Sequence, residues 1–160
     1  LNFMIKINVF TKSEKHWQQL LQLAEPQAKA YPKLILDAYQ HLADSAIQQN
    51  RSAEAQSFLQ KAITFLNTIG DNPKLSKQDN QIQQAHVITI LANVLKSENK
   101  FEEAEADYKN ALDILMKSLG SSHPALAPTL ESYADLLART YREPEAEHML
   151  ACAKALTKKD

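Results

Sequence analysis

The chain has 160 residues, of which 44% are hydrophobic and 23% charged, a balance typical of a folded globular domain rather than a disordered or collagen-like chain. Its 18 Lys and Arg against 19 Asp and Glu give a net charge of −1, which excludes an overall basic field for nucleic acid or an anionic membrane. Two glycines, Gly70 and Gly120, are too few for a phosphate-binding loop or the turns of a β-sandwich, and the single Cys152 excludes an intrachain disulfide. We therefore expect an all-α domain.

Residues 1–12 precede the first predicted helix, and their pattern leaves three alternatives open. Apolar residues stand at the odd positions up to Val9 with Lys6 among them, which is not the apolar core of a secretory signal. A short strand, a disordered segment or a sequence introduced by cloning would each fit. No apolar run approaches the roughly 20 residues that span a bilayer, so we expect no membrane insertion. We predict a cytoplasmic protein, with export followed by removal of a signal as the alternative.

Residues 13–31 are predicted to form an N-terminal helix that does not carry the pattern found later in the chain. Pro26 should end or kink this helix, and Tyr31-Pro32 marks the start of the next one. We expect it to cap the first helical hairpin through four apolar side chains: Trp17, Leu20, Leu21 and Leu23.

The rest of the chain contains one pattern three times. Its middle copy reads Ile88-x2-Leu91-Ala92-x2-Leu95, then Ala104-x3-Tyr108-x2-Ala111. The copy before it reads Tyr39-x2-Leu42-Ala43-x2-Ala46, then Ala55-x3-Leu59-x2-Ala62, and the copy after it reads Leu130-x2-Tyr133-Ala134-x2-Leu137, then Ala146-x3-Leu150-x2-Ala153. Large residues three and four apart form one stripe of a helix, and the small alanines permit another helix to approach closely.

A short polar turn joins the two halves of each copy. The three turns are 49–52, 98–100 and 142–144. Asn99 with Glu102 is typical of a helix N-cap pair, and Pro144 suits a first helical position. Each copy is therefore predicted to be an antiparallel helical hairpin.

These residues resemble the tetratricopeptide repeat (TPR) family, which has this order of large residues and alanines. The equivalent alanines are 42 residues apart from Ala104 to Ala146 and 49 apart from Ala55 to Ala104, rather than the usual 34. The 42-residue spacing and the connector Leu119-Gly120-Ser121-Ser122-His123-Pro124-Ala125 resemble the kinesin-light-chain type of TPR. The hairpins are expected at about 32–70, 80–120 and 124–158 within residues 32–160.

The resemblance implies a right-handed superhelical α-α solenoid whose concave groove is lined by the first helix of each hairpin. Residues of those helices that lie between the core positions are expected to face the groove: Asp37, Gln40, Asp44, Gln48, His86, Thr89, Asn93, Lys96, Glu131, Asp135 and Arg139. Three of them, Asp44, Asn93 and Asp135, hold equivalent positions just after a small alanine. Together they would accept hydrogen bonds from an extended peptide backbone, and Asn93 could also donate. A solvated face without a ligand is the alternative.

The predicted function is a non-catalytic protein-interaction module that holds a peptide or segment of a partner protein. TPRs that clamp acidic C-terminal tails use Lys and Arg beside Asn, because a terminal carboxylate needs charge-assisted donors. The groove expected here carries Asp37, Asp44, Glu131 and Asp135, which would repel such a tail. A partner peptide with some basic character fits better.

The alternative function is a structural or self-association segment of a larger protein. Its last predicted helix keeps Met149, Leu150 and Leu156, although a terminal repeat usually presents a polar outer face. Either a following segment or another molecule would cover this helix, and a homo-oligomer is one form of the second option.

Candidates for chemistry are few. His148 and Cys152 stand four apart on one helix face, but no third metal ligand has a suitable spacing. The imidazole of His123, in the connector, is expected to bond backbone. We therefore expect no catalytic residues, no metal and no cofactor.

Overall fold

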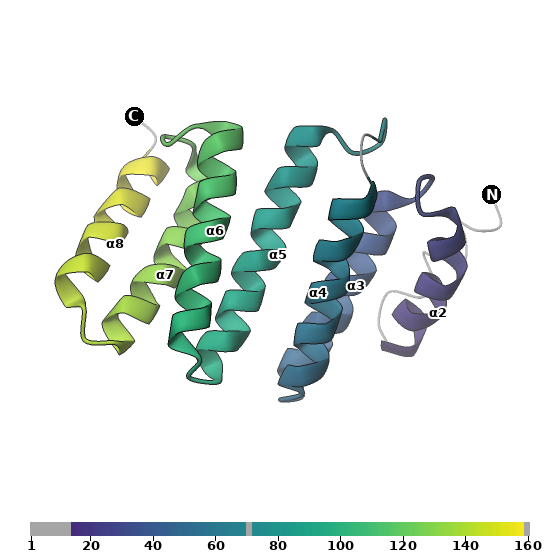
Figure 1. The fold of residues 1–160 in the computed structure, drawn as a ribbon, viewed down its shortest axis with the longest axis horizontal. Helices are drawn as coiled ribbons and strands as arrows, with labels where there is room; N and C mark the ends of the chain where they lie inside the picture. Colours follow the sequence, from purple (N-terminus) through teal and green to yellow (C-terminus); the bar gives the residue numbers. More distant parts are fainter. Residues whose placement is uncertain (1–13, 70–71, 159–160) are drawn as a thin grey trace. The chain divides into compact units, whose positions relative to one another are not determined.

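The computed structural model describes residues 14–69 and 72–158, and it is built from helices (Figure 1). The N-terminal extension at residues 1–12 lies outside the described residues. The helices divide between two compact units, residues 1–77 and residues 78–160. None of the helices in the described ranges is long and apolar enough to cross a membrane.

The first unit contains an N-terminal helix followed by one hairpin. Its elements are α2 (Glu14–Ala24), a 3-10 turn (Glu25–Gln27), α3 (Pro32–Gln48) and α4 (Ser52–Ile69). The helix α2 packs on α3 through buried Leu20, Leu21 and Ala24, and the Trp17 ring stacks on His41 with centroids 4.4 Å apart. Leu23, expected to face the hairpin, is 57% exposed, because the inward position is taken by Ala24 instead.

Asn72 anchors the connector that follows α4. Its side chain is buried; the Nδ2 donates to the carbonyl of Lys29 at 3.0 Å, and Oδ1 accepts from the backbone N–H of Lys74 at 2.8 Å. The ammonium of Lys74 also donates to the carbonyl of Ala30. These bonds hold the connector after α4 against the segment between α2 and α3, within the first unit.

The second unit contains two hairpins. Its elements are α5 (Lys77–Ser97), α6 (Phe101–Leu119), a 3-10 turn (Pro124–Leu126), α7 (Ala127–Arg139) and α8 (Glu143–Thr157). The rings of Tyr108 on α6 and Tyr133 on α7 stack with centroids 5.7 Å apart, which joins the two hairpins. In the connector, His123 Nδ1 accepts the backbone N–H of Ala125 at 3.1 Å, as expected for this imidazole.

The repeated alanines are buried where helices approach one another. Those of the first helices are Ala43, Ala92 and Ala134, each at most 1% exposed, and those of the second helices include Ala62, Ala111 and Ala153, each 0% exposed. A side chain larger than a methyl group would overpack these contacts. The predicted all-α class, three hairpins after an N-terminal helix, is confirmed.

Each hairpin turn ends its first helix with one residue in the left-handed region. These residues are Asn50 (φ 56°), Asn99 (φ 61°) and Tyr141 (φ 60°). In each case the next residue donates its N–H back to the last helical turn: Arg51 to Ala46, Lys100 to Leu95 and Arg142 to Leu137. The predicted N-cap role of Asn99 is wrong, because Asn99 closes the preceding helix and Lys100 occupies the cap without a side-chain bond.

Candidate peptide-binding groove

The residues predicted to line the groove lie on α3, α5 and α7, the first helices of the three hairpins. The helix α3 carries Asp37, Gln40, Asp44 and Gln48 in the first unit. In the second unit, α5 carries His86, Thr89, Asn93 and Lys96, and α7 carries Glu131, Asp135 and Arg139. Because the chain divides into two compact units, the geometry below concerns α5 with α7 and α3 by itself.

A buried pair of hydroxyls joins α5 to α7. The Oγ1 atoms of Thr89 and Thr129 lie 3.0 Å apart, and both residues are buried. Thr89 Oγ1 also donates to the carbonyl of Ala85, one turn earlier. Thr89 therefore holds the two helices in register and presents little surface to a ligand.

Two cations converge on one carboxylate oxygen a little further along these helices. Lys96 Nζ lies 2.7 Å and Arg139 Nε 3.1 Å from Oδ2 of Asp135. The hydrogen bond from Lys96 is the main reason that the pKa of the Asp135 carboxyl lies below its ordinary value, and Arg139 adds to it. Because both cations use Oδ2, the second oxygen of Asp135 is left to accept another hydrogen bond.

Lys96 is unusual in being a buried cation. Its residue is 8% exposed, and Nζ donates to the carbonyl of Ser132 at 3.2 Å in addition to its pair with Asp135. The same ammonium lies 5.7 Å from the centre of the Tyr108 ring. Removal of Asp135 would therefore leave a buried charge with incomplete compensation.

The side chain of Asn93 is oriented by Tyr108. The Tyr108 hydroxyl donates to Asn93 Oδ1 at 2.5 Å, and burial raises the pKa of this phenol, so it stays protonated and remains a donor. With Oδ1 engaged from the α6 side, the NH2 group of the half-buried Asn93 keeps its donors for another acceptor. The sequence predicted Asn93 as a groove residue, whereas Tyr108 was predicted only as a packing residue.

The remaining predicted positions in the second unit, His86 and Glu131, are exposed. On α3, Asp44 and Gln48 are exposed, whereas Asp37 and Gln40 are half-buried. Burial raises the pKa of Asp37 despite the opposing charges of Lys33 and His41. The Nε2 atom of Gln40 is buried without a hydrogen-bond partner.

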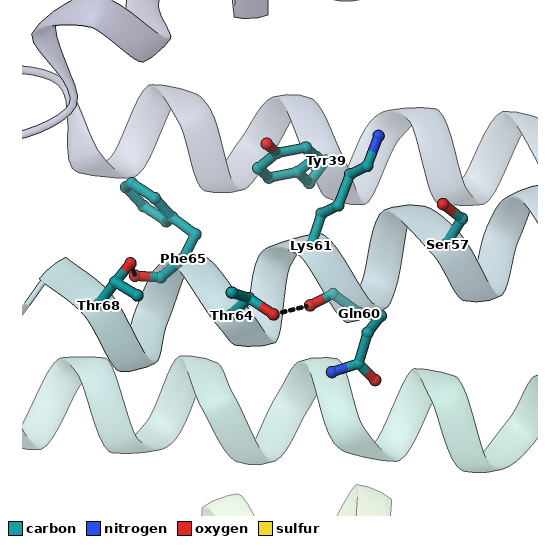
Figure 2. A pocket seen from close by; sticks show the side chains of 7 residues that line it. All are labelled: Tyr39, Ser57, Gln60, Lys61, Thr64, Phe65 and Thr68. Carbon is teal, nitrogen blue, oxygen red and sulfur yellow. Dashed lines mark hydrogen bonds between the residues drawn. The ribbon is translucent and has the colours of Figure 1, made fainter.

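A hollow of about 480 Å³ lies elsewhere, along one face of α4 (Figure 2). It is lined by Tyr39 of α3 and by Ser57, Gln60, Lys61, Thr64, Phe65 and Thr68 of α4. The hydroxyls of Thr64 and Thr68 are turned back to helix carbonyls, those of Gln60 and Phe65. The α4 residues that line the hollow are spaced three and four apart along the sequence, but the predicted groove included only the first helices of the hairpins.

The described side chains offer little for metal chemistry. Cys152 Sγ and His148 Nε2 lie 3.8 Å apart on α8. In residues 14–69 and 72–158, no three or more His, Cys, Asp or Glu side chains are grouped so that they could hold a metal ion.

Comparison with known proteins agrees with this architecture. Sequence models described as tetratricopeptide repeat match residues 83–159 and 36–65. The crystal structure of BtubC (BKLC) from P. vanneervenii is similar, with a TM-score of 0.74 and 14% identity over 89% of this chain and 55% of that chain. This chain thus spans about half the length of that protein, and at this identity the likeness concerns the fold. No curated protein sequence matches the chain. The chain belongs to the tetratricopeptide repeat family.

Proposed function

We propose that the chain is a non-catalytic protein-interaction module that holds an extended segment of a partner protein against the first helices of its hairpins. TPRs generally mediate protein–protein interaction and are generally not catalytic. The 42-residue, kinesin-light-chain-like type remains a prediction, as does a groove that continues from α3 to α7.

The observation that carries this proposal is the arrangement of polar atoms on α5 and α7. Tyr108 holds Asn93 so that its NH2 group remains as a donor, while Lys96 and Arg139 hold Asp135 through one oxygen and leave the other as an acceptor. An extended peptide presents alternating N–H and C=O groups, so it needs both a donor and an acceptor. Because both side chains are fixed by neighbours, little conformational entropy is lost when a peptide binds.

The charges of these residues support the predicted partner class. Asp135 already neutralises Lys96, so Lys96 offers little net charge to an acidic C-terminal tail. The exposed carboxylates Glu131 on α7 and Asp44 on α3 remain to attract basic groups. We propose a neutral or basic segment as the partner, with an affinity on the order of micromolar because the segment must be ordered on binding.

The sharpest test replaces Asn93 by aspartate. Asn93→Asp keeps an oxygen for the Tyr108 hydroxyl and removes the outward donors, while the negative charge that it adds favours a basic segment and therefore acts against the expected loss. We expect partner affinity to fall by about 1–3 kcal/mol, equivalent to roughly 5- to 150-fold. Affinity capture from a native lysate, quantified by mass spectrometry, would identify the partner with wild-type protein, and titration would then compare the variant.

The hollow on α4 supplies the matched control. Gln60→Ala changes an exposed residue that lines the hollow and lies outside the predicted groove. A partner that is lost with Asn93→Asp and kept with Gln60→Ala supports the groove, provided that circular dichroism shows unchanged helix content. A partner that is lost with Gln60→Ala and kept with Asn93→Asp would place binding on α4 and overturn the proposal.

A further inference from the structure

The outer face of α8 is less buried than the equivalent faces of α4 and α6. Leu150 holds the position of Leu59 in α4 and Tyr108 in α6, which are both 0% exposed, yet Leu150 is 39% exposed. Within the second unit Tyr108 is covered by Tyr133 of the next hairpin. The only residues of α8 that are buried are Ala146 and Ala153, and the described residues cover Leu150 only in part, so the helix presents a partly exposed apolar centre.

Charged residues flank this centre in a sign-separated order. Glu143 and Glu147 precede it, Lys154 and Lys158 follow it, and all four are exposed. None of the four takes part in an ion pair within the described part of the chain. On α6, by contrast, Lys109 and Lys117 pair with acids four residues earlier.

The spacing explains why the α8 charges do not pair with each other. Glu147 and Lys154 are seven residues apart and Glu143 and Lys158 fifteen apart, whereas only partners three or four apart meet on a helix. At 100° per residue these four residues, with Leu150 and Ala151, nevertheless lie on one face. This face of α8 is therefore charged and incompletely buried, and its acidic and basic side chains cannot form ion pairs with one another within the helix.

An antiparallel copy of the same helix complements this face. When two α8 helices pair about a two-fold axis between Leu150 and Ala151, residues equally far from that point lie level with each other. Glu147 then faces Lys154 of the other copy, Glu143 faces Lys158, and the two Leu150 side chains meet at the centre. Each contact occurs twice, because the two-fold axis repeats it.

We propose that α8 is a homodimer contact in which two copies of the chain pack α8 antiparallel, with Leu150 at the centre and the Glu147–Lys154 pair at each side. The contact is weak. Leu150 is its main apolar side chain, and exposed ion pairs contribute little in water. One helix face of this length also buries less area than a standard stable interface. We expect self-association only at high protein concentration, on the order of 100 μM, and weaker association at high salt because the charges are screened.

A charge-swap series on the full chain tests the proposal by sedimentation velocity between about 10 μM and 1 mM. Glu147→Lys and Lys154→Glu each place like charges opposite one another twice per dimer, and each should raise the dissociation constant by about tenfold or more. The double variant Glu147→Lys/Lys154→Glu restores the pairing with reversed sign, so it should associate like the wild type. Glu102→Lys, on the exposed surface of α6, is the control for net charge and should leave association unchanged.

The rescue by the double variant is the decisive outcome. Wild-type association that each single variant weakens and the double variant restores supports the antiparallel contact. A wild type that stays monomeric up to 1 mM overturns it and leaves α8 to a different partner. Association that the double variant does not restore, or that Glu102→Lys weakens equally, also overturns it, since it would then depend on another surface or on net charge.

Discussion

The turn that closes the first hairpin and the turn that closes the last have the same backbone but different residues at the critical position. Asn50 and Tyr141 have φ values of 56° and 60°, and the following arginines, Arg51 and Arg142, donate the same backward N–H bond. Asparagine tolerates this left-handed conformation, whereas a tyrosine there is an outlier. The comparison shows that the turn geometry is imposed by the hairpin and is tolerated even by an unsuitable residue.

Both turns are also held by the arginine that follows. Arg51 bridges Glu14 of α2 at 2.7 Å and Glu54 of its own helix. Arg142 bridges Glu105 of α6 at 2.9 Å and Glu145 of its own helix at 2.6 Å. The middle turn has Lys100, which pairs instead with Glu98 of the same turn. Each arginine thus connects its turn to the helix that precedes the hairpin, α2 for Arg51 and α6 for Arg142.

The largest expected effect comes from removing Glu105, the α6 carboxylate that pairs with Arg142. Glu105→Ala removes the acceptor of Tyr133, Arg142 and Lys109, at 2.8, 2.9 and 2.7 Å. We expect a loss of about 2 kcal/mol in the free energy of unfolding, because the Tyr133 hydroxyl is part-buried and cannot fully exchange its partner for water. Urea unfolding followed by circular dichroism measures it.

Glu14→Ala is the matched variant in the first unit. Its carboxylate accepts from Arg51, Ser45 and Gln49. The Glu14 side chain is somewhat more exposed than that of Glu105, 27% against 20%, and no tyrosine hydroxyl donates to it, so the loss should be smaller. Equal losses for the two variants would show that the tyrosine hydroxyl adds nothing to the contact at Glu105. Unchanged stability of Glu105→Ala would refute the contact altogether.

The Glu105 carboxylate also makes the free energy of unfolding depend on pH. Hydrogen bonds from Lys109, then Tyr133 and Arg142, outweigh burial and lower the Glu105 pKa from 4.5 to about 2. The folded state therefore binds fewer protons than the unfolded state between these values, so this contribution is complete above about pH 5 and is lost as the pH falls towards 2. Because water screens these charges, we expect the contribution of Glu105 to the free energy of unfolding to fall by only about 1 kcal/mol over this pH range. Unfolding free energies of wild type and Glu105→Gln from pH 6 to 2.5 should converge towards acid, and parallel curves would contradict this assignment.

The hairpins could be predicted because their alanines are local signals. An alanine between large residues at helical spacing has one main structural explanation, and Ala43, Ala92 and Ala134 are buried accordingly. Asn99 was misassigned because asparagine suits both an N-cap and a left-handed turn, and nothing nearby distinguishes the two. Tyr141 could not have been predicted, since tyrosine disfavours the conformation that it adopts here.

The candidate site was predicted less well because it depends on the register between helices. Thr89 was assigned to the groove, but its environment is decided by Thr129, forty residues later. The pairing of Lys96 with Asp135 also depends on the register between α5 and α7, which the periodicity of a single helix does not specify. Sequence patterns therefore give the face of a single helix, whereas contacts between helices determine which of its polar atoms remain available.

The smallest expected effect comes from exchanging the residues of the two turns. Tyr141 is 89% exposed, so Tyr141→Asn loses little packing and relieves the left-handed conformation. We expect it to raise the free energy of unfolding by about 0.5–1 kcal/mol, and the reciprocal Asn50→Tyr to lower it by a similar amount. Thermal unfolding of both variants and of the double exchange would measure this, and the double exchange should return close to the wild type because the sites are independent. A Tyr141→Asn variant that is less stable than the wild type would mean that the tyrosine ring stabilises its turn.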